Sequence, residues 1–471
     1  MLLWFRRDLR LSDHAALHAA AASGLPVVPV FLWTPEDGDE APGASSGWWL
    51  HQSLVALERS LRARGSRLIV RSGPAAETLL QLAAETRARH IFCNRIYEPR
   101  ALAAEPALEA RLRAKGVSIE SFNGSLLFEP GAILTAAGGS FRVFTPFWRA
   151  LSNQRGTLRK PERRPRTISA PRTWPQSLKV ADLGLEPRVD WATGIRAAWT
   201  PGEEAAQKRL HSFAIRSVLR YGEDRNRTDV EGTSRLSPHL HFGEISPIQI
   251  WHAVADRPGA EPYLRQLAWR EFAYHLLVET PETIREPFQA EFQNFPWRRN
   301  TRRLRTWQKG QTGYPLVDAA MRQLWTTGWM HNRARLVAAS FLVKHLLIPW
   351  QQGAAWFLDT LVDADLANNT MGWQWVAGCG VDAAPYFRIL NPVAQGEKFD
   401  PHGVYVRRWV PELAALPDEW IHKPWEAPPA MLAAAGVQMG NTYPRPIVDH
   451  AEARQAALAA FQEMKRVGRG K

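Results

Sequence analysis

Cysteine is scarce in this chain of 471 residues, which contains only Cys93 and Cys379, far apart in the sequence. Two distant cysteines exclude a disulfide framework, and without a CxxC pair they also exclude a cysteine-rich zinc or iron–sulfur site. We therefore expect a reducing cytoplasm. Long apolar runs are missing too, because MLLWF leads directly into arginines and SFLVKHLLIPW is interrupted by Lys344 and His345. The sequence predicts no signal peptide and no membrane-spanning segment.

Three familiar binding motifs are also missing. The first expected strand-to-helix turn reads RRDLR without GxGxxG, so this region is not expected to hold NAD or FAD in the Rossmann manner. Asp363 and Asp365 superficially begin a calcium loop, but Asn368 stands where that loop requires glycine. His239 and His241 have no metal-binding spacing and are expected to lie in a loop. We predict no metal site.

Acidic residues are outnumbered, since 59 lysines and arginines face 46 aspartates and glutamates, for a net charge of +13. Such a surplus favours a polyanionic partner, because lysine and arginine neutralise phosphates and a positive field accelerates the encounter with nucleic acid. A GC-rich genome that favours arginine gives the same surplus without any nucleic-acid partner. Charge therefore leaves both interpretations open.

The N-terminal part of the chain alternates two patterns. Short apolar runs read LLWF, VVPVFLW, RLIV and HIFC, and amphipathic segments lie at 13–22, 48–64, 75–87 and 107–115. This alternation predicts a doubly wound α/β domain with a parallel sheet, whose ligands bind beyond the carboxyl ends of the strands. We assign this domain to residues 1–128.

The composition and periodicity of the sequence change after the α/β pattern. Residues 129–202 include the proline- and arginine-rich text KPERRPRTISAPRTWPQ without a sustained period, and they predict an interdomain linker. Residues 203–471 are predicted to form an all-α domain, because apolar residues recur at helical spacing in 247–255, 263–279, 315–326, 332–347 and 354–363. The tail after Asp449 is expected to be one helix ending in the basic VGRGK.

Tryptophan is abundant, with 21 residues, and the aromatic excess lies in the second half. Residues 363–375 read DADLANNTMGWQW and combine two acids, two adjacent amides and two tryptophans around small residues. That composition favours a segment that surrounds a ligand, and flat rings at this density favour stacking or electron transfer. The alternative is that the tryptophans fill a large helical core.

Two further segments carry polar groups suited to a ligand. Residues 221–238 read YGEDRNRTDVEGTSRLSP, where hydroxyls, backbone N–H groups and a cation gather before a proline. This turn predicts either a pyrophosphate site or an ordinary helix N-cap by Ser237. In LRQLAWREFAYHLL, Gln266, Trp269 and Arg270 lie three or four residues apart and therefore share one helical face.

A third segment, GWMHNRARLVAASFLVKHLL, places Asn332 and Arg335 on one side of an expected helix. A charge buried among apolar residues needs an opposite charge or hydrogen bonds. We therefore expect Arg335 to pair with Asp363 or Asp365.

These segments together resemble one family. The blocks LLWFRRDLRLSDHAAL, VFTPFWRAL, EGTSRLSPHLHFGE, WREF, TGYPLVDAAMRQLWTTGWMHNR, DADLANN, GWQWVAGCG and DAAPYFRILNPVAQGEKFD occur in order over nearly the whole chain. They resemble the DNA photolyase and cryptochrome family, and most of all bacterial photolyases that repair cyclobutane pyrimidine dimers. The resemblance implies light-driven repair of ultraviolet-damaged DNA, in which excited reduced FAD gives an electron to a flipped-out lesion and later recovers it.

The resemblance also implies a set of FAD-binding residues in the helical domain. They are Tyr221, Thr233, Ser234, Arg235, Leu236, Ser237, Arg270, Trp329, Asn332, Arg335, Asp363, Asp365 and Asn369. Asn369 would face the flavin N5, where an amide can donate or accept a hydrogen bond. Trp373, Trp350 and Trp297 would pass electrons from the surface to the flavin, and three core tryptophans are the alternative.

Contacts to the lesion and to DNA follow from the same resemblance. Trp269 and Trp375 would form the aromatic walls of the lesion pocket, and Gln266 and Leu336 would face the substrate. The candidate phosphate contacts, each of which could equally be a solvated surface side chain, are Arg225, Arg333, Arg388 and Lys398.

The chain departs from the family pattern at two of these positions. Gln266 stands where dimer photolyases have a glutamate that hydrogen-bonds the damaged thymine. An amide can donate a hydrogen bond but cannot supply a proton, so we expect retained binding and a lower repair yield. Leu336 replaces a methionine of similar volume, a mild change. Glutamine also occurs in (6-4) photolyases, which keeps that substrate as an alternative.

An antenna chromophore in the N-terminal domain is a further implication. Tyr97, Glu98, Pro99 and Arg100 are expected on its ligand loop. We expect methenyltetrahydrofolate, with a deazaflavin or an empty domain as alternatives. The protein is expected to be a monomer in the bacterial cytoplasm, associated with the nucleoid when bound to DNA.

Two other functions fit the same blocks. One is a cryptochrome-type blue-light photoreceptor that signals through a partner, although the short C-terminus argues against it because signalling members extend well beyond the core. The other is a DNA-binding flavoprotein that has lost repair, which Gln266 makes conceivable.

Overall fold

A computed structural model describes residues 1–34 and 42–469 of the chain. It divides into two compact units. The first unit comprises Met1–Leu219, Ser234–Pro281 and Val362–Ala367, and the second comprises Arg220–Thr233, Glu282–Leu361 and Asn368–Lys471. Within the described residues, no helix has the length and apolarity needed to cross a lipid bilayer.

The first unit contains the predicted parallel sheet. Its strands are β1 (Leu2–Phe5), β2 (Val28–Trp33), β3 (Ile69–Ser72), β4 (His90–Asn94) and β5 (Ser118–Phe122), in the order β3-β2-β1-β4-β5. Leu3 of β1 lies opposite Pro29 on one side and Phe92 on the other. The order reverses at β1, so β1 and β4 diverge toward different neighbours and leave a crevice at their carboxyl ends.

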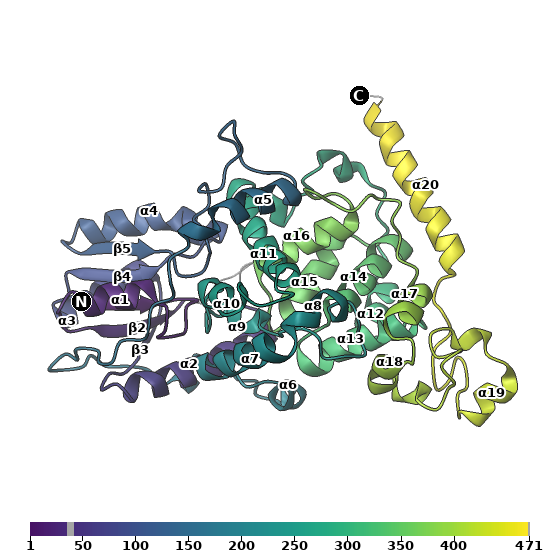
Figure 1. Cartoon of the computed structure of the whole chain (residues 1–471), viewed down its shortest axis with the longest axis horizontal. Coiled ribbons are helices and arrows are strands. Elements are labelled where there is room, and N and C mark those ends of the chain that lie inside the picture. The colour runs from purple at the N-terminus through teal and green to yellow at the C-terminus, as the bar shows by residue number, and fades with distance from the viewer. Residues whose placement is uncertain (35–41, 470–471) are drawn as a thin grey trace. The chain divides into compact units, whose positions relative to one another are not determined.

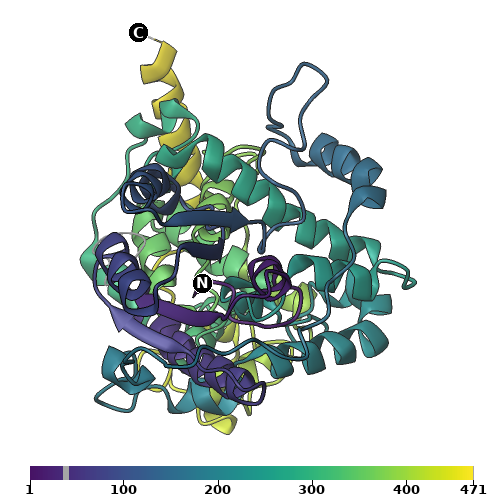
Figure 2. The same cartoon turned by 90° about the vertical axis from the view of Figure 1, so that its left-hand side faces the viewer.

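Helices cover both faces of this sheet (Figures 1 and 2). Right-handed crossovers put α1 (Ala15–Ala22) and α2 (Ala44–Arg62) on one face and α3 (Ala75–Thr86) and α4 (Pro99–Arg113) on the other. Because both faces are buried, the central strands β1 and β2 are continuously apolar, and Leu2, Val30, Ile69 and Ile91 have no exposed surface. The doubly wound fold is confirmed.

Two parts of the predicted pattern differ from the structure. The helix expected at 107–115 already begins at Pro99, because proline is tolerated in a first helical turn, whereas Pro106 inside the helix made the sequence resemble a start. Strand β5 was not predicted. Its sequence SIESF alternates apolar and polar residues for only five positions, and none of them is fully buried.

Outside the sheet, the first unit combines helices with long irregular segments. It contains α5 (Phe144–Gln154), α6 (Thr193–Ala198), α7 (Glu203–Arg216), α9 (Ser237–His241), α10 (Pro247–Val254) and α11 (Glu261–Glu279). Helix α10 starts with a capping box, in which Ser246 and Gln249 each accept the other's backbone N–H. Helix α5 packs on α11 through Phe144, whose ring stacks on Trp269 at 3.8 Å.

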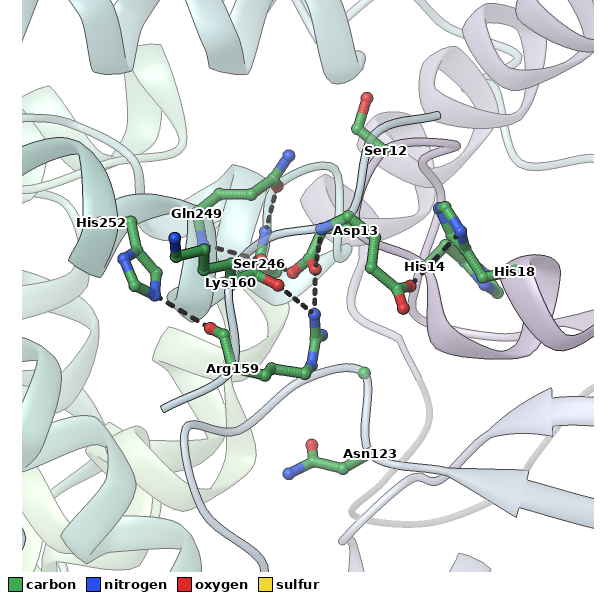
Figure 3. Close-up of polar contacts among 12 residues, drawn as sticks. Ser12, Asp13, His14, His18, Asn123, Arg159, Lys160, Ser246, Gln249 and His252 are labelled. Atoms are coloured by element: carbon green, nitrogen blue, oxygen red, sulfur yellow. Dashed lines mark hydrogen bonds and ion pairs between the residues drawn. The ribbon is translucent and has the colours of Figure 1, made fainter. Parts of the chain in front are cut away.

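A buried polar cluster holds residues 159–162 of the predicted linker against the start of α1, within the first unit (Figure 3). Asp13 has no exposed surface and a left-handed φ of 52°. Its carboxylate accepts hydrogen bonds from the Arg159 guanidinium and the Ser246 hydroxyl, and from the backbone N–H of Glu162 at 3.1 Å. His252 Nε2 lies 2.9 Å from the Arg159 carbonyl oxygen. The linker residues 159–162 are therefore held in place although their sequence has no period.

The second unit is all-α, as predicted. Its helices are α8 (Tyr221–Asp224), α12 (Thr301–Gln308), α13 (Pro315–Thr327), α14 (Asn332–Ser340), α15 (Trp350–Thr360), α17 (Pro392–Phe399), α18 (Val404–Trp409), α19 (Pro429–Ala434) and α20 (His450–Arg469), together with most of α16 (Leu366–Ala377). The helix expected at 332–347 ends at Ser340 and continues as a π-helical turn, Phe341–His345. The single C-terminal helix is confirmed by α20, and the last two residues of VGRGK lie outside the described part.

Candidate functional site

The crevice at the carboxyl ends of β1 and β4 is narrow. Its cavity of about 20 Å³ is lined by residues at or just beyond the ends of β1, β4 and β5 and by residues of α9 and α11: Arg7, Asp8, Asn94, Arg95, Ile96, Tyr97, Glu98, Ser125, Leu240, His241, Arg270 and Tyr274. Arg7 forms an ion pair with the buried Glu98 across it. Such a volume holds about one water molecule. A larger ligand would require these side chains to move.

The residues expected on an antenna loop are only partly in a loop. Tyr97 and Glu98 precede α4, whereas Pro99 and Arg100 form its first turn. The Tyr97 hydroxyl donates to Glu129 Oε1 at 2.8 Å, and burial together with the Glu129 charge raises the pKa of Tyr97. The phenol therefore stays neutral and acts as a donor at this edge of the sheet.

Asp365 is the centre of a buried network within the first unit. The Tyr274 hydroxyl donates to Asp365 Oδ2 at 2.5 Å, and His241 Nδ1 lies 3.9 Å from the same oxygen. Burial alone would raise the pKa of Asp365, but the nearby His241 ring and the Arg270 charge lower it below its ordinary value. The carboxylate therefore remains ionised. Its expected pairing with Arg335 stays a prediction.

Arg270 is fixed beside this network. Its Nη1 donates to the Ser125 carbonyl oxygen at 2.8 Å, and its guanidinium lies 4.8 Å from the centre of the Tyr274 ring. Periodicity predicted Arg270 but missed Tyr274, which is one helical turn further along α11. His241 and Arg7 were missed too, because their sequence neighbours carry no sign of a contact with Asp365 or Glu98.

The turn before α9 has an unusual backbone. Arg235 adopts a left-handed φ of 50°, and its guanidinium lies 4.3 Å from the Trp199 ring centre. The Ser234 hydroxyl accepts a hydrogen bond from the Tyr263 hydroxyl at 3.0 Å. Ser237 is the first helical residue and is exposed, and the N-cap position is Leu236, which is buried. Ser237 is therefore not the N-cap.

The loop expected for the two histidines is wrong, since both lie in α9. His239 pairs with Glu244, which also accepts hydrogen bonds from Trp49 Nε1 at 3.2 Å and from the Gly202 N–H at 2.7 Å. These contacts give His239 a structural role within the packed interior. In the part of the chain that the structure describes, no group of three or more His, Cys, Asp or Glu side chains is arranged to hold a metal ion.

The predicted polar stripe of α11 exists. Gln266, Trp269 and Arg270 lie on this one continuous helix, Gln266 and Trp269 half-buried and Arg270 buried. Trp269 stacks on Phe144 at an interplanar angle of 9°. Its ring is therefore held as a fixed aromatic surface.

The predicted electron-transfer tryptophans all lie in the second unit. Trp373 on α16 packs edge-on against Phe357 at 5.0 Å and Trp307 at 6.3 Å, and its Nε1 is buried without an acceptor among the described residues. Trp350 is buried at the start of α15. Trp297 is half-buried, with its ring 4.3 Å from Phe295. A buried indole N–H normally has an acceptor, so Trp373 fits a site that accommodates a ligand.

The other predicted residues of the second unit are distributed over several elements. Asn369 is half-buried, and its Nδ2 donates to the Ala354 carbonyl oxygen at 3.1 Å, which fixes the orientation of the amide. Arg335 Nε donates to the Met330 carbonyl oxygen at 2.8 Å. Tyr221 and Trp329 are buried, Thr233, Leu336 and Trp375 are half-buried, and Asn332 and Arg388 are exposed.

Two of the four predicted phosphate contacts lie over one ring, that of Phe399, and a third, Arg225, is close enough to Arg333 for its charge to act on it. The Arg333 guanidinium lies 4.4 Å and the Lys398 ammonium 5.4 Å from the centre of Phe399, and Arg333 also donates to Asn226 Oδ1 at 2.6 Å. Burial and the like charge of Arg225 lower the pKa of Arg333. An anion placed here would relieve this repulsion. No contact joins Arg388 to the cluster among the described residues.

The comparisons with known proteins first define a class, an enzyme with a flavin-binding domain. A family model for DNA photolyase matches residues 1–166, and one for the FAD binding domain of DNA photolyase matches residues 263–463. The chain belongs to the DNA photolyase and cryptochrome family, and within it to the photolyase enzymes.

Individual relatives cover the chain almost completely. Deoxyribodipyrimidine photo-lyase of Agrobacterium fabrum is 47% identical and spans 99% of this chain and 98% of its own. Cryptochrome-2 of Arabidopsis thaliana is 39% identical over 98% of this chain and 79% of its own.

Solved structures extend the likeness to the fold. A bacterial class III photolyase from Agrobacterium tumefaciens superposes with a TM-score of 0.95 at 47% identity and covers 99% of this chain and 97% of its own. An archaeal photolyase from Sulfolobus tokodaii, described with two FAD molecules and a novel light-harvesting cofactor, has a TM-score of 0.83 at 29% identity and covers 98% of this chain and 99% of its own.

Proposed function

We propose that this protein repairs cyclobutane pyrimidine dimers in ultraviolet-damaged DNA, using light and FAD. The observation that carries the proposal is a group of cations in a chain that matches photo-lyases over its whole length: Arg333 and Lys398 lie over the Phe399 ring, and the charge of Arg225 acts on Arg333. Cations that repel one another are suited to a polyanion, and DNA phosphates are the polyanions that photolyases meet.

The flavin-binding residues of the proposal are Tyr221, Thr233, Ser234, Arg235, Leu236, Ser237, Arg270, Trp329, Asn332, Arg335, Asp363, Asp365 and Asn369. Reduced FAD, when bound and excited by light, supplies one electron to the lesion. The chain's own residues position it: hydroxyls and backbone N–H groups of the 233–237 turn suit phosphate oxygens, and Asn369 presents an amide fixed by Ala354. The ionised Asp365 lies close to Arg270, and the two opposite charges compensate each other.

The remaining roles concern electrons and substrate. Trp373, Trp350 and Trp297 would carry electrons from the surface, because indole rings are oxidised more readily than the aliphatic core around them. Trp269 and Trp375 would stack on the flipped-out bases, and Gln266 and Leu336 would contact them. The rigid stacking of Trp269 on Phe144 supports this, since a pre-positioned ring loses little entropy on binding.

The proposal includes an antenna chromophore, methenyltetrahydrofolate or alternatively a deazaflavin, in the domain formed by residues 1–128. The light-harvesting cofactor described for the Sulfolobus tokodaii photolyase supports a second chromophore of some kind. Residues 129–202 would be the linker, and residues 203–471 the FAD- and DNA-binding domain. A monomer in the cytoplasm, associated with the nucleoid when bound to DNA, completes the proposal.

One experiment tests the function. Reduced protein is mixed with an oligonucleotide that carries a thymine dimer, illuminated with blue light, and the recovery of thymine absorbance is followed. A parallel sample carries a (6-4) lesion, and dark samples are the controls. Recovery with the dimer only is expected. Recovery with the (6-4) lesion only would assign the other substrate and contradict the proposal.

The second candidate is a blue-light photoreceptor of the cryptochrome type, favoured by the 39% identity with Cryptochrome-2 over 98% of the chain. Such a protein would keep FAD and light-driven reduction without restoring bases. A protein that is photoreduced but repairs neither lesion would support this candidate.

A further inference from the structure

A second cavity lies in the first unit, at the sheet edge formed by β3. This edge is separated from the crevice of β1 and β4 by strand β2. Strand β3 is an edge strand, and linker residues cover it: the Leu178 N–H donates to the Val70 carbonyl oxygen at 3.0 Å, and the Val70 N–H donates to Ser177 Oγ at 2.9 Å. We call residues 177–181 the strap. A cavity of about 470 Å³ lies between the strap, β3 and α2. That volume accommodates a small organic molecule.

The walls of this cavity are of two kinds. Val55 from α2, Leu68 and Val70 at β3, and Leu178 and Val180 from the strap provide apolar surface. The polar lining is predominantly basic, with His51, Arg62, Arg67 and Lys179 beside Glu58.

Glu58 is already satisfied. Its Oε1 accepts a hydrogen bond from Arg62 Nε at 2.6 Å, and its Oε2 accepts the Leu68 N–H at 2.5 Å. This carboxylate therefore leaves Arg67 and Lys179 without an acidic partner among the residues that line the cavity. The lining as a whole carries a positive charge, which favours an anionic occupant.

Two buried nitrogen atoms at the cavity, one of an imidazole and one of a guanidinium, have no hydrogen-bond partner in the described part of the chain. His51 is 8% exposed and lines the cavity, and its Nδ1 makes no hydrogen bond, while its Nε2 lies 4.0 Å from Glu186. Arg67 Nη2 donates to the Pro175 carbonyl oxygen at 2.9 Å, and its guanidinium lies 5.2 Å from the Trp174 ring, but its buried Nε makes no hydrogen bond. Buried polar groups of this kind are usually satisfied, so a ligand acceptor would complete them.

We propose that this cavity binds a small amphipathic anion, with an apolar body between α2 and the strap and an acidic group facing His51 and Arg67. A carboxylate, sulfonate or phosphate would suit these donors, because each presents acceptor oxygens at one end. The site contains none of the residues assigned to FAD, lesion or DNA contacts, and its occupation does not depend on the proposed repair.

The probe for this site is 1-anilinonaphthalene-8-sulfonate, which joins a flat apolar body to one sulfonate and becomes fluorescent in apolar surroundings. Holoprotein with bound flavin is titrated with the probe. Val55→Trp fills the cavity, Arg67→Gln removes the cation, and Arg89→Gln is the matched control on the exposed surface outside the lining. Circular dichroism and the thermal midpoint verify that each variant is folded.

Saturable binding by the wild type is expected. The Kd should rise about 10-fold or more with either cavity variant, because Arg67→Gln removes one charge-assisted hydrogen bond and Val55→Trp removes the apolar volume. The Kd should stay unchanged with Arg89→Gln. No saturable binding, or equal Kd values for all four proteins, would overturn the proposal. Repair rates are expected to be the same in all four, so failure of this site and failure of the repair function are separate results.

Discussion

Tyr274 stabilises the charge of Asp365, a residue of the proposed flavin site. Its hydroxyl is 2.5 Å from Asp365 Oδ2, and both residues are buried. Tyr274→Phe should lower the free energy of unfolding by about 1–3 kcal/mol at pH 7, because a buried carboxylate loses a donor. Tyr386→Phe is the control, since the Tyr386 hydroxyl is buried without a partner among the described residues, and its loss should cost nothing. Urea denaturation monitored by fluorescence measures both.

The pH dependence of the same variant has a definite sign. The folded-state pKa of Asp365 is lowered below its ordinary value of 3.8, so its contribution is fully present above that value and is lost as pH falls toward the folded-state pKa. Removing the Tyr274 hydroxyl moves the folded-state pKa upward. The difference between wild type and Tyr274→Phe should therefore be largest at neutral pH and shrink below about pH 4. A constant difference at all pH values would contradict an ionised Asp365.

A substitution of Gln266 tests which hydrogen-bonding group the proposed lesion pocket requires. Gln266→Glu restores a carboxyl group that can donate a proton as well as a hydrogen bond, so the quantum yield of dimer repair should rise, on the order of twofold. The yield is measured as thymine recovered per photon absorbed, with substrate in saturating amounts. The affinity for damaged DNA should change little. A lower yield in the variant would show that the amide is the better partner here.

At the scale of elements, α15 and α16 approach each other through a glycine. A Cβ at position 353 on α15 would overlap the indole ring of Trp373 on α16, whereas a Cβ at Gly372 would meet no atom within 4 Å. Gly353→Ala should destabilise the protein by about 1–3 kcal/mol through overpacking, and Gly372→Ala should be neutral or stabilise by up to about 1 kcal/mol. Thermal unfolding measures both.

The variants Gly353→Ala and Gly372→Ala also test the role of Trp373. If this ring belongs to the electron path, the displacement caused by Gly353→Ala should slow the photoreduction of bound FAD, and Gly372→Ala should leave its rate unchanged. Photoreduction is followed by absorbance under blue light with an external reductant. Equal rates in the two variants would place Trp373 in the core only.

At the scale of the whole molecule, the net charge of +13 and the cluster around Phe399 make a prediction about salt. Binding to DNA should weaken steeply as salt rises, because each neutralised phosphate releases a counterion. Arg333→Gln should weaken binding to damaged and undamaged duplexes equally and reduce the slope of log K against log salt by about 1. Fluorescence anisotropy at several salt concentrations gives the slopes. An unchanged slope would remove Arg333 from the phosphate contacts.

Much of the architecture follows from local pattern. Strand β1 has the bounds of the run LLWF, and α11 and α13 begin and end within two residues of the predicted helices, because apolar periodicity reflects burial directly. Strand β5 was missed, since a half-buried strand of five residues carries little signal. The end of α14 at a π-helical turn was missed as well, because residues 341–345 are uniformly buried and show no change of period.

By itself the sequence determined the parallel sheet, the helical remainder and the shared face of Gln266, Trp269 and Arg270, because these depend on spacing along one element. Tertiary structure decided which distant groups meet: Tyr274 with Asp365, Asp13 with Arg159, and Arg333 with Phe399. Such contacts join residues 66 to 146 positions apart, and pairing of charges or donors across that separation leaves no trace in local periodicity. The basic cavity beneath the linker likewise exists only because the chain folds back over β3.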